Sequence, residues 1–390
     1  MTTASLKVGI VGCGILGTNH ARYFGKTNPR TQLVAVTDLV EQRARDLAAV
    51  HNVHAYAAVS AMCDKEHLDL VVVATPDPYH RDPVVAAAEA GVPNIITEKP
   101  MATSVADATA MRDAARRAGS RLWVHLPSRC APEEIASRYV VQEGLIGKPV
   151  YGDLVIDDNI SVPTHMWRER SQQWAGESSV AQFLFSHATD RMRWLFEAEV
   201  QRVQTLSVRQ VLGYTADLYD THIFWTNGLV LRLKAEWIRH MESLVTGRFT
   251  LSGESGGLQQ TNADYVTERG WQATLDQAIT AEQLEGHQRA LRERGVFSRA
   301  VIRRPHEDVE GLGTRPSLEV SSKFLPLFGG APPPEMRDHL VNAILEEVEV
   351  PESWRGNGRL PTADDGVEQT RIVCAIEESA RAHEAVVLIA

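Results

Sequence analysis

The stretch LKVGIVGCGILGTNHARYF, residues 6–24, decides the fold prediction for the first part of the chain. An apolar run leads directly into Gly12, Gly14 and Gly17, which have the spacing GxGxxG, and a helix-like segment follows. In such a unit the first glycine permits a tight turn, the second lets the backbone approach a pyrophosphate, and the third allows close packing of helix and strand. The N-terminus of the helix would face the phosphate anions. The stretch therefore predicts a dinucleotide-binding turn.

Asp38 strengthens this prediction. It ends the next apolar run, QLVAVTD, at the distance from the glycines where a carboxylate can hold a ribose 2′-hydroxyl. Leu39 follows instead of an arginine, so a 2′-phosphate would meet a carboxylate without a cation beside it, and the sequence favours NAD over NADP. The alternative interpretation of Asp38 is a turn residue that caps the next helix. The residues that we assign to the cofactor in this region are Gly12, Gly14, Ile15, Leu16, Gly17 and Asp38.

The pattern of apolar residues differs between the two parts of the sequence. From residue 5 to about 125, short Val- and Ile-rich runs alternate with longer Ala-, Arg- and Glu-bearing stretches, which predicts strand–helix units on a buried parallel sheet. Beyond residue 150, longer runs alternate with period two, which predicts a mainly antiparallel sheet with one solvated or partner-covered face. We therefore predict an α/β chain with a doubly wound Rossmann domain, residues 1–126, and an α/β domain with a large open sheet, residues 127–390. Within the second domain, residues 259–335 are expected to be an atypical insertion, and the C-terminal helix is expected to pack back on the first domain.

Composition excludes several classes of protein. The chain has 390 residues, of which 44% are hydrophobic, enough for two cores. Its formal charge of -10 is spread along the chain and no dense stripe of Lys and Arg occurs, which argues against nucleic acid as a partner. The four cysteines lack paired spacing, so we expect neither a disulfide framework nor a metal site. No basic leader and no apolar run long enough to span a membrane are found, so we expect a cytoplasmic protein.

Polar residues follow two further apolar runs, in VVVATPDPYH and NIITEKP. Ligands of doubly wound sheets bind outside the carboxyl ends of the strands. An isolated lysine is normally a solvated surface cation, but Lys99 ends an apolar strand, and Pro100 disfavours a helical conformation for it. The residues that we place beside the nicotinamide are Thr75, Pro76, His80, Glu98 and Lys99.

Several motifs resemble the glucose–fructose oxidoreductase, inositol dehydrogenase and rhizopine-catabolism (Gfo/Idh/MocA) family of NAD(P)-dependent sugar dehydrogenases. The resemblance covers nearly the whole chain apart from residues 259–335, and its most specific element is TEKPMA. It implies that Lys99 orients the reacting hydroxyl and lowers its proton affinity. It also implies a substrate pocket in the second domain and a homodimer or homotetramer formed through the open sheet. The stretches that carry the resemblance are GIVGCGILGTNH, VTD, ATPDPYH, TEKPMA, HATDRMRWL, FTLSGESGGL and DDGVEQTRIVCAIEESARAHEAVVL.

The second motif of that family is altered in this chain. The family places an aspartate four residues before a histidine and another aspartate three residues after it. His187 and Asp190 match, but Phe183 stands where the first aspartate would be. On an α-helix, residues four apart share a face, so the missing carboxylate would lie beside His187. His187 could still accept the hydroxyl proton, because histidine titrates near neutrality, whereas the alternative is a core histidine satisfied by one hydrogen bond. Asp190 is expected to be structural or to orient the histidine.

The substrate pocket is expected to combine hydrogen-bonding groups with aromatic rings, as sugar sites commonly do. The aromatic replacements around position 183 suggest a drier pocket than an inositol site, which fits a glycoside, deoxysugar or aryl-bearing substrate. The candidate substrate-binding residues are Arg129, Asp158, Trp167, Arg168, Trp174, Phe183 and His187, and Asn159 is a further polar candidate.

Three functions remain open at this point. The first is hydride transfer between NAD and a ring hydroxyl or keto group of a sugar, cyclitol or glycoside derivative, with Lys99 orienting the hydroxyl and His187 shuttling the proton. The second is a glycosidase or lyase that oxidises the sugar transiently and recycles its NAD. The third is an NAD-binding protein without catalytic activity, which the presence of Phe183 suggests.

Overall fold

The computed structural model describes residues 5–264, 268–303, 313–321, 334–354 and 356–388. Contacts divide the chain into two units. The first unit consists of Met1–Leu126, Met336–Ser353 and Arg359–Cys374, and the second of Pro127–Glu335, Trp354–Gly358 and Ala375–Ala390. The long helix α13, Ala363–Ala382, therefore contributes residues to both units.

The first unit contains the predicted parallel sheet. Its six strands are all parallel, in the order β3-β2-β1-β4-β5-β6. They are β1 (Leu6–Val11), β2 (Thr31–Thr37), β3 (His54–Tyr56), β4 (Leu70–Val73), β5 (Asn94–Glu98) and β6 (Arg121–His125). The strand order reverses direction between β1 and β4, which is where a doubly wound sheet opens a crevice at its carboxyl edge. The predicted fold of this part of the chain is confirmed.

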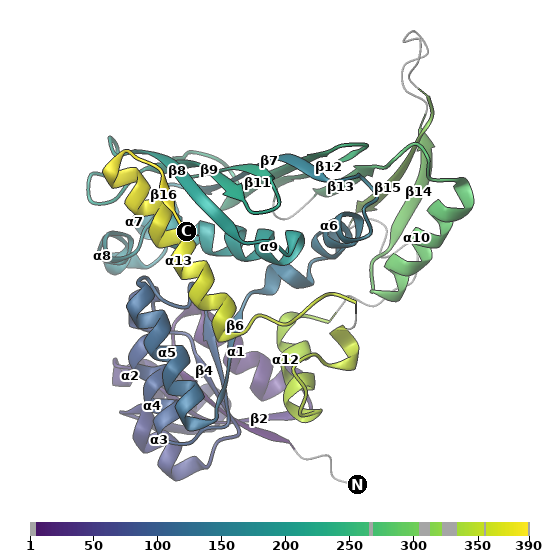
Figure 1. Cartoon of the computed structure of the whole chain (residues 1–390). Coiled ribbons are helices and arrows are strands. Elements are labelled where there is room, and N and C mark those ends of the chain that lie inside the picture. The colour runs from purple at the N-terminus through teal and green to yellow at the C-terminus, as the bar shows by residue number, and fades with distance from the viewer. Residues whose placement is uncertain (1–4, 265–267, 304–312, 322–333, 355, 389–390) are drawn as a thin grey trace. The chain divides into compact units, whose positions relative to one another are not determined.

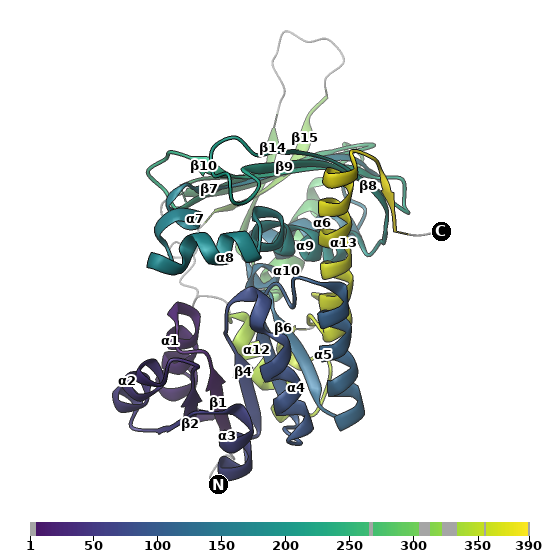
Figure 2. The same ribbon diagram turned by 90° about the vertical axis from the view of Figure 1, so that its left-hand side faces the viewer.

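Helices cover both faces of this sheet. The helices of the unit are α1 (Ile15–Arg22), α2 (Glu41–His51), α3 (Val59–Glu66), α4 (Arg81–Glu89), α5 (Val105–Ala118), α12 (Met336–Leu345) and part of α13. Buried residues of α3, α4 and α5 form one core cluster with the strands, and α12 lies on the other side of the sheet (Figures 1 and 2). The helix α5 begins at the expected cap, because Ser104 Oγ accepts a hydrogen bond from the Asp107 amide. It ends at Gly119, whose φ of 73° is left-handed.

The second unit is built on a ten-stranded mixed sheet, in the order β14-β15-β13-β12-β11-β7-β10-β9-β8-β16. Neighbouring strands are antiparallel except for the parallel pair of β7 and β10. The prediction of an open and mainly antiparallel sheet is therefore confirmed. The strands are β7 (Pro149–Asn159), β8 (Val200–Val208), β9 (Leu218–Trp225), β10 (Val230–Arg239), β11 (Val245–Gly253), β12 (Gly257–Asp264), β13 (Glu268–Thr274), β14 (Ser298–Arg303), β15 (Arg315–Ser321) and β16 (Val386–Val387).

Helices lie on one face of this sheet (Figures 1 and 2). They include α6 (Pro132–Gln142), α7 (Ser161–His165), α8 (Ser171–Glu177), α9 (Ser186–Phe196) and α10 (Ala281–Glu293). Inward-facing residues of β10 are all fully buried beneath them, which explains the period-two pattern of that strand. The segment expected to be an insertion continues the same sheet through β13, β15 and β14, with α10 beside β14.

No helix within the described ranges is long and apolar enough to cross a lipid bilayer.

Candidate active site

The glycine-rich turn joins β1 to α1. A different local constraint explains why each of the three positions is a glycine. Gly12 has a φ of 94°, and a Cβ there would lie 2.6 Å from the Ala74 carbonyl oxygen. A Cβ on Gly17 would lie 1.8 Å from the carbonyl oxygen of Gly12, so the helix can pack on the turn only without a side chain. A Cβ on Gly14 would meet no atom within 4 Å. Gly14 therefore faces open space in front of α1, where a phosphate group can approach the backbone.

Asp38 is fixed at the end of β2 beside this turn. Its Oδ2 accepts a hydrogen bond of 2.8 Å from the Cys13 amide, and its Oδ1 accepts one of 2.8 Å from the Val40 amide. Both interpretations of Asp38 thus have a structural counterpart: it stabilises its own turn, and its carboxylate is held next to the glycine loop. Burial and the nearby Asp38 carboxylate raise the pKa of the Cys13 thiol to about 12, so Cys13 stays a neutral packing residue.

Exposed apolar side chains surround the carboxyl edge of the first sheet. Ile15 and Leu16 follow β1 and are 56% and 39% exposed, and Tyr79 follows β4 and is 48% exposed. Leu39, directly after Asp38, is 95% exposed. Large apolar side chains that are exposed together at the strand ends favour a binding site for a ligand with planar rings.

His80 connects two of the predicted cofactor segments. It is 1% exposed, and its Nδ1 and Nε2 each lie 2.8 Å from a backbone carbonyl oxygen, that of Pro100 and that of Thr75, respectively. The side chain therefore holds the end of β4 against the segment that follows β5. This position favours a supporting role for His80 over direct contact with a cofactor, and its assignment to the cofactor site stays a prediction.

Lys99 directly follows β5 and is 8% exposed. The peptide bond between Lys99 and Pro100 is cis, and the Lys99 amide lies 3.4 Å from Glu98 Oε2. A lysine held at the carboxyl edge of a parallel sheet is in the region where doubly wound proteins bind their ligands.

A buried cluster of His20, Glu98 and His125 lies next to Lys99, and sequence reasoning did not find it. Glu98 Oε1 is 2.7 Å from His20 Nε2 and 2.9 Å from His125 Nδ1. Burial by itself would raise the pKa of Glu98, but His125 and His20 outweigh it and hold that pKa well below its usual range. Glu98 and His125 are paired in the register of β5 and β6. The available signal was a polar residue at the end of each of the two strand runs NIITE and RLWVH.

The composition of this cluster also suits a metal ion, because the three candidate ligand atoms lie within 4.8 Å of one another. The two contacts to Glu98 have hydrogen-bond lengths. Arg337 NH1 lies 3.4 Å from His20 Nδ1 and can only donate there, which leaves the proton of a neutral His20 on Nε2, facing Glu98. We interpret the cluster as hydrogen-bonded side chains.

His187 lies in the first turn of α9 in the second unit, directly after the π-helical segment η5, Ala181–Phe185. The chain between Phe183 and His187 is therefore partly π-helical, with i→i+5 hydrogen bonds. That position 183 lies beside His187 stays a prediction. Phe183 packs against Trp174 and Trp237, with ring centroids 5.1 Å and 6.1 Å away. His187 itself is partly buried.

Asp190 and Arg129 form a buried ion pair in the second unit. Arg129 Nε and NH2 donate to the two carboxylate oxygens of Asp190 at 2.8 Å and 2.5 Å, and the side chains are 1% and 0% exposed. The burial of this ion pair favours a structural role for Arg129. Its assignment to the substrate site stays a prediction. The structural alternative proposed for Asp190 agrees with this geometry.

The remaining substrate candidates gather around an aromatic cluster. Trp167 lies 5.5 Å from Trp174 between ring centroids, and Trp174 lies 5.4 Å from Trp237. Trp237 Nε1 donates to Asp158 Oδ2 at 3.1 Å. Sequence reasoning missed Trp237, although it continues the inward-facing set of β10. Asn159 instead donates to the Met241 carbonyl oxygen, and the side chain of Arg168 lies outside the part of the chain that the structure describes.

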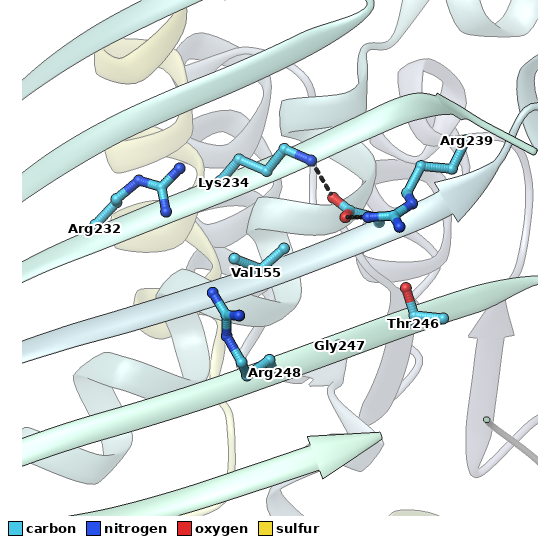
Figure 3. Close-up of a pocket in the computed structure, with 8 residues that line it drawn as sticks. Val155, Arg232, Lys234, Arg239, Thr246, Gly247 and Arg248 are labelled. Atoms are coloured by element: carbon cyan, nitrogen blue, oxygen red, sulfur yellow. Dashed lines mark hydrogen bonds and ion pairs between the residues drawn. The ribbon is translucent and has the colours of Figure 1, made fainter. Parts of the chain in front are cut away.

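The helix-free face of the second sheet carries a hollow lined by charged residues (Figure 3). Asp157 accepts hydrogen bonds from Lys234 at 2.7 Å and from Arg239 at 3.0 Å. Asp153 in turn accepts from Arg232 at 3.0 Å and Arg248 at 2.8 Å. In this hollow, Asp153 and Asp157 are thus paired with cations of the same chain.

Comparison with known proteins finds family models that match both parts of the chain. A family described as "Oxidoreductase family, NAD-binding Rossmann fold" matches residues 6–126, and the "GFO/IDH/MocA C-terminal domain" matches residues 136–259. Inositol 2-dehydrogenase of Acidothermus cellulolyticus is 26% identical over 290 residues, which cover 74% of this chain and 78% of that protein.

Solved structures show the same fold over the whole chain. The WlbA dehydrogenase from Bordetella pertussis, in complex with NADH and UDP-GlcNAcA, has a TM-score of 0.75 and 19% identity and covers 100% of this chain and 99% of its own. A levoglucosan dehydrogenase in complex with NADH and L-sorbose has a TM-score of 0.73 and 20% identity and covers 99% of each chain.

Proposed function

The chain belongs to the GFO/IDH/MocA family of NAD-binding oxidoreductases, and from this premise we propose that it transfers a hydride between NAD and a ring hydroxyl or keto group of a sugar, cyclitol or glycoside derivative. The relatives support this substrate class, because one is named an inositol dehydrogenase and a protein of the same fold is named a levoglucosan dehydrogenase. The observation that carries the proposal is the buried position of Lys99 at the carboxyl edge of a sheet that also bears the glycine turn and Asp38.

In this proposal, separate residues bind the cofactor, orient the reacting hydroxyl and accept its proton. The turn around Gly14 and the N-terminus of α1 receive the pyrophosphate, and Asp38 accepts a hydrogen bond from the adenine ribose. Bound NAD supplies the hydride acceptor. Lys99 donates a hydrogen bond to the reacting hydroxyl and lowers its proton affinity. His187 accepts the hydroxyl proton, a step for which histidine is suited near neutral pH.

NAD is preferred over NADP in this proposal. The Asp38 carboxylate is held by two backbone amides, so it cannot swing away to admit a 2′-phosphate without breaking both hydrogen bonds. Repulsion between the two anions would then disfavour NADP. Titration of the protein with each cofactor measures the preference directly.

Aromatic surroundings support a substrate with an apolar portion. Phe183 packs against Trp174 and Trp237 at the start of the segment that carries His187. A glycoside, deoxysugar or aryl-bearing ring would place an apolar surface where a bare polyol presents hydroxyl groups. Such a substrate suits this segment better than inositol does.

The test is a screen of sugars, cyclitols and glycosides with NAD, in which NADH absorbance and product mass are read from the same reaction. The proposal predicts NADH and a product two mass units lighter in equal amounts. Product without NADH would identify a cofactor-recycling glycosidase or lyase instead. Tight NAD binding with neither signal across the screen would favour a protein without catalytic activity.

The assembly is proposed to be a homodimer or homotetramer formed through the helix-free face of the second sheet. Its paired charges around Asp157 and Asp153 would be mirrored by a second copy. We further propose a cytoplasmic location, since the described cysteines are all free. Sedimentation over a range of protein concentrations tests the assembly, because a homodimer or homotetramer dissociates on dilution and its mass falls to that of one chain.

A further inference from the structure

The π-helical segment η5, Ala181–Phe185, is tied to the C-terminal helix α13 by one carboxylate. Glu377 Oε1 accepts a hydrogen bond of 2.6 Å from Ser179 Oγ, and Glu377 Oε2 accepts one of 3.0 Å from Gln182 Nε2. Ser179 Oγ in turn accepts one of 3.0 Å from the Gln182 backbone amide. These three residues of the second unit therefore form a closed set of hydrogen bonds, which we call the Glu377 network.

The Glu377 network lies in a mostly buried position. Ser179 and Gln182 are 4% and 2% exposed, and Glu377 is partly buried. Hydrogen bonds to an ionised carboxylate are stronger than those between neutral groups, and low local polarity strengthens them further. A π-helical turn is a rare conformation that is frequently found at functional sites. The Glu377 network thus stabilises a rare backbone turn at its first residues.

This turn leads directly into the proposed proton acceptor. The segment η5 ends at Phe185, the helix α9 begins at Ser186, and His187 is its second residue. The conformation of the turn therefore sets the direction in which α9 starts and, with it, the place of the imidazole. Glu377 belongs to the last helix of the chain and has no part in the proposed hydride transfer.

We propose that Glu377 is a positioning residue that acts through the Glu377 network on the turn before His187, and thereby places His187 to accept the hydroxyl proton. The inference rests on the proposed function. Proton transfer requires that the two heavy atoms lie within hydrogen-bond distance, so a small displacement of the imidazole slows it. Glu377 itself contributes neither a proton nor a contact with the substrate.

The experiment is a double-mutant cycle between Glu377 and His187 in the full-length protein, with NAD and the sugar, cyclitol or glycoside that reacts in the screen. Glu377→Gln keeps the size of the side chain, removes its charge and leaves one oxygen for two donors. It should lower kcat roughly ten- to hundredfold, because a misplacement of about 1 Å can cost about 10²-fold. KM should change little, since the lost interaction acts in the chemical step.

The cycle separates positioning from a general loss of structure. In the His187→Gln background the proton acceptor is already absent, so adding Glu377→Gln should change kcat by no more than about twofold. A purely structural role would lower kcat by the same factor in both backgrounds, because it would reduce the fraction of folded protein irrespective of His187. The stoichiometry of NAD binding, measured by calorimetry, gives that fraction independently.

Glu378 provides a matched control, because it is the next residue of α13 and its side chain is exposed. Glu378→Gln makes the same chemical change outside the Glu377 network and should leave kcat unchanged. Ser179→Ala removes the hydroxyl that joins Glu377 to the turn. It should show the same dependence on His187, and it tests the inference even when Glu377→Gln fails to fold.

The outcomes separate the inference from the proposed function. The inference is wrong if Glu377→Gln has the kcat of the Glu378→Gln control, or if its loss is the same with and without His187. In both cases NAD-dependent turnover by the unmodified protein leaves the proposed function standing. If His187→Gln keeps the full kcat, His187 is not the proton acceptor and the inference is overturned with that role. If the unmodified protein turns over no substrate with NAD, the proposed function is overturned together with the inference.

Discussion

The carboxyl edge of the first sheet and the segment around His187 in the second unit both carry candidate catalytic residues, but they are stabilised in different ways. At the sheet edge, short polar contacts fix the groups: backbone amides hold Asp38, and two imidazoles hold Glu98. Before His187, the chain forms a π-helical turn in which Phe183 packs against Trp174. We propose that the first region binds the cofactor and that the second contributes to the substrate site.

The largest expected effect is at Lys99. Lys99→Ala should lower kcat/KM by roughly 10²- to 10³-fold, the usual cost of removing one donor that stabilises developing negative charge. NAD affinity should change far less, because the glycine turn and Asp38 remain. Steady-state kinetics on the substrate found in the screen and calorimetry with NAD measure the two effects. Lys65→Ala, at an exposed lysine of α3, is the control. Equal losses in the two variants would remove Lys99 from the mechanism.

The second prediction concerns the buried pair in the second region. Asp190→Asn removes the negative charge that faces the buried Arg129 guanidinium, and it should lower the free energy of unfolding by about 3–5 kcal/mol. Asp153→Asn, which affects pairs on the partly exposed sheet face, should cost about 1 kcal/mol or less. Denaturant unfolding compares them. Similar losses would mean that the buried pair has no special structural role.

The glycine turn gives a prediction that separates folding from cofactor binding. Gly17→Ala forces a Cβ against the Gly12 carbonyl, so the melting temperature should fall. Gly14→Ala meets no protein atom and has an extended backbone that alanine tolerates. It should melt normally while NAD affinity drops about tenfold, because the methyl group occupies the phosphate approach. An unchanged NAD affinity in Gly14→Ala would contradict the placement of the pyrophosphate.

Asp38 tests cofactor choice. Asp38→Asn removes the negative charge and keeps one of the two oxygens that accept from the Cys13 and Val40 amides, so discrimination against NADP should relax by roughly three- to tenfold. Dissociation constants for NAD and NADP provide the ratio. If the preference for NAD survives unchanged, another group sets it.

The smallest effect is expected at Phe183, in the region that departs from the family. Phe183→Leu should cost about 1 kcal/mol of stability, since the side chain is only partly buried and leucine fills part of its volume. It should also lower kcat/KM more for an aryl glycoside than for inositol. Measuring kcat/KM of both proteins on each of the two substrates tests this difference. Equal losses would show that Phe183 has no part in substrate selection.

The parts that could be predicted from the sequence depend on local patterns. A few neighbouring residues are enough to predict three features. These are the spacing of the glycines, the end of β2 at Asp38 and the position of Lys99 before Pro100. The partners that sequence reasoning missed are distant in the chain: Glu98 meets His125 through strand register, and Arg129 meets Asp190 across 61 positions. The π-helical turn before His187 was not predicted either, and Phe183 within it packs against Trp237, which lies on another element of the second unit.

The central claim is that hydride moves between a ring carbon of a carbohydrate and NAD. The most direct measurement uses the substrate found in the screen, labelled with deuterium at the oxidised ring carbon, and determines the masses of both the cofactor and the product. The account predicts one deuterium in the reduced cofactor and none at that carbon of the product. Deuterium that returns to the product, with no labelled reduced cofactor accumulating, would contradict it.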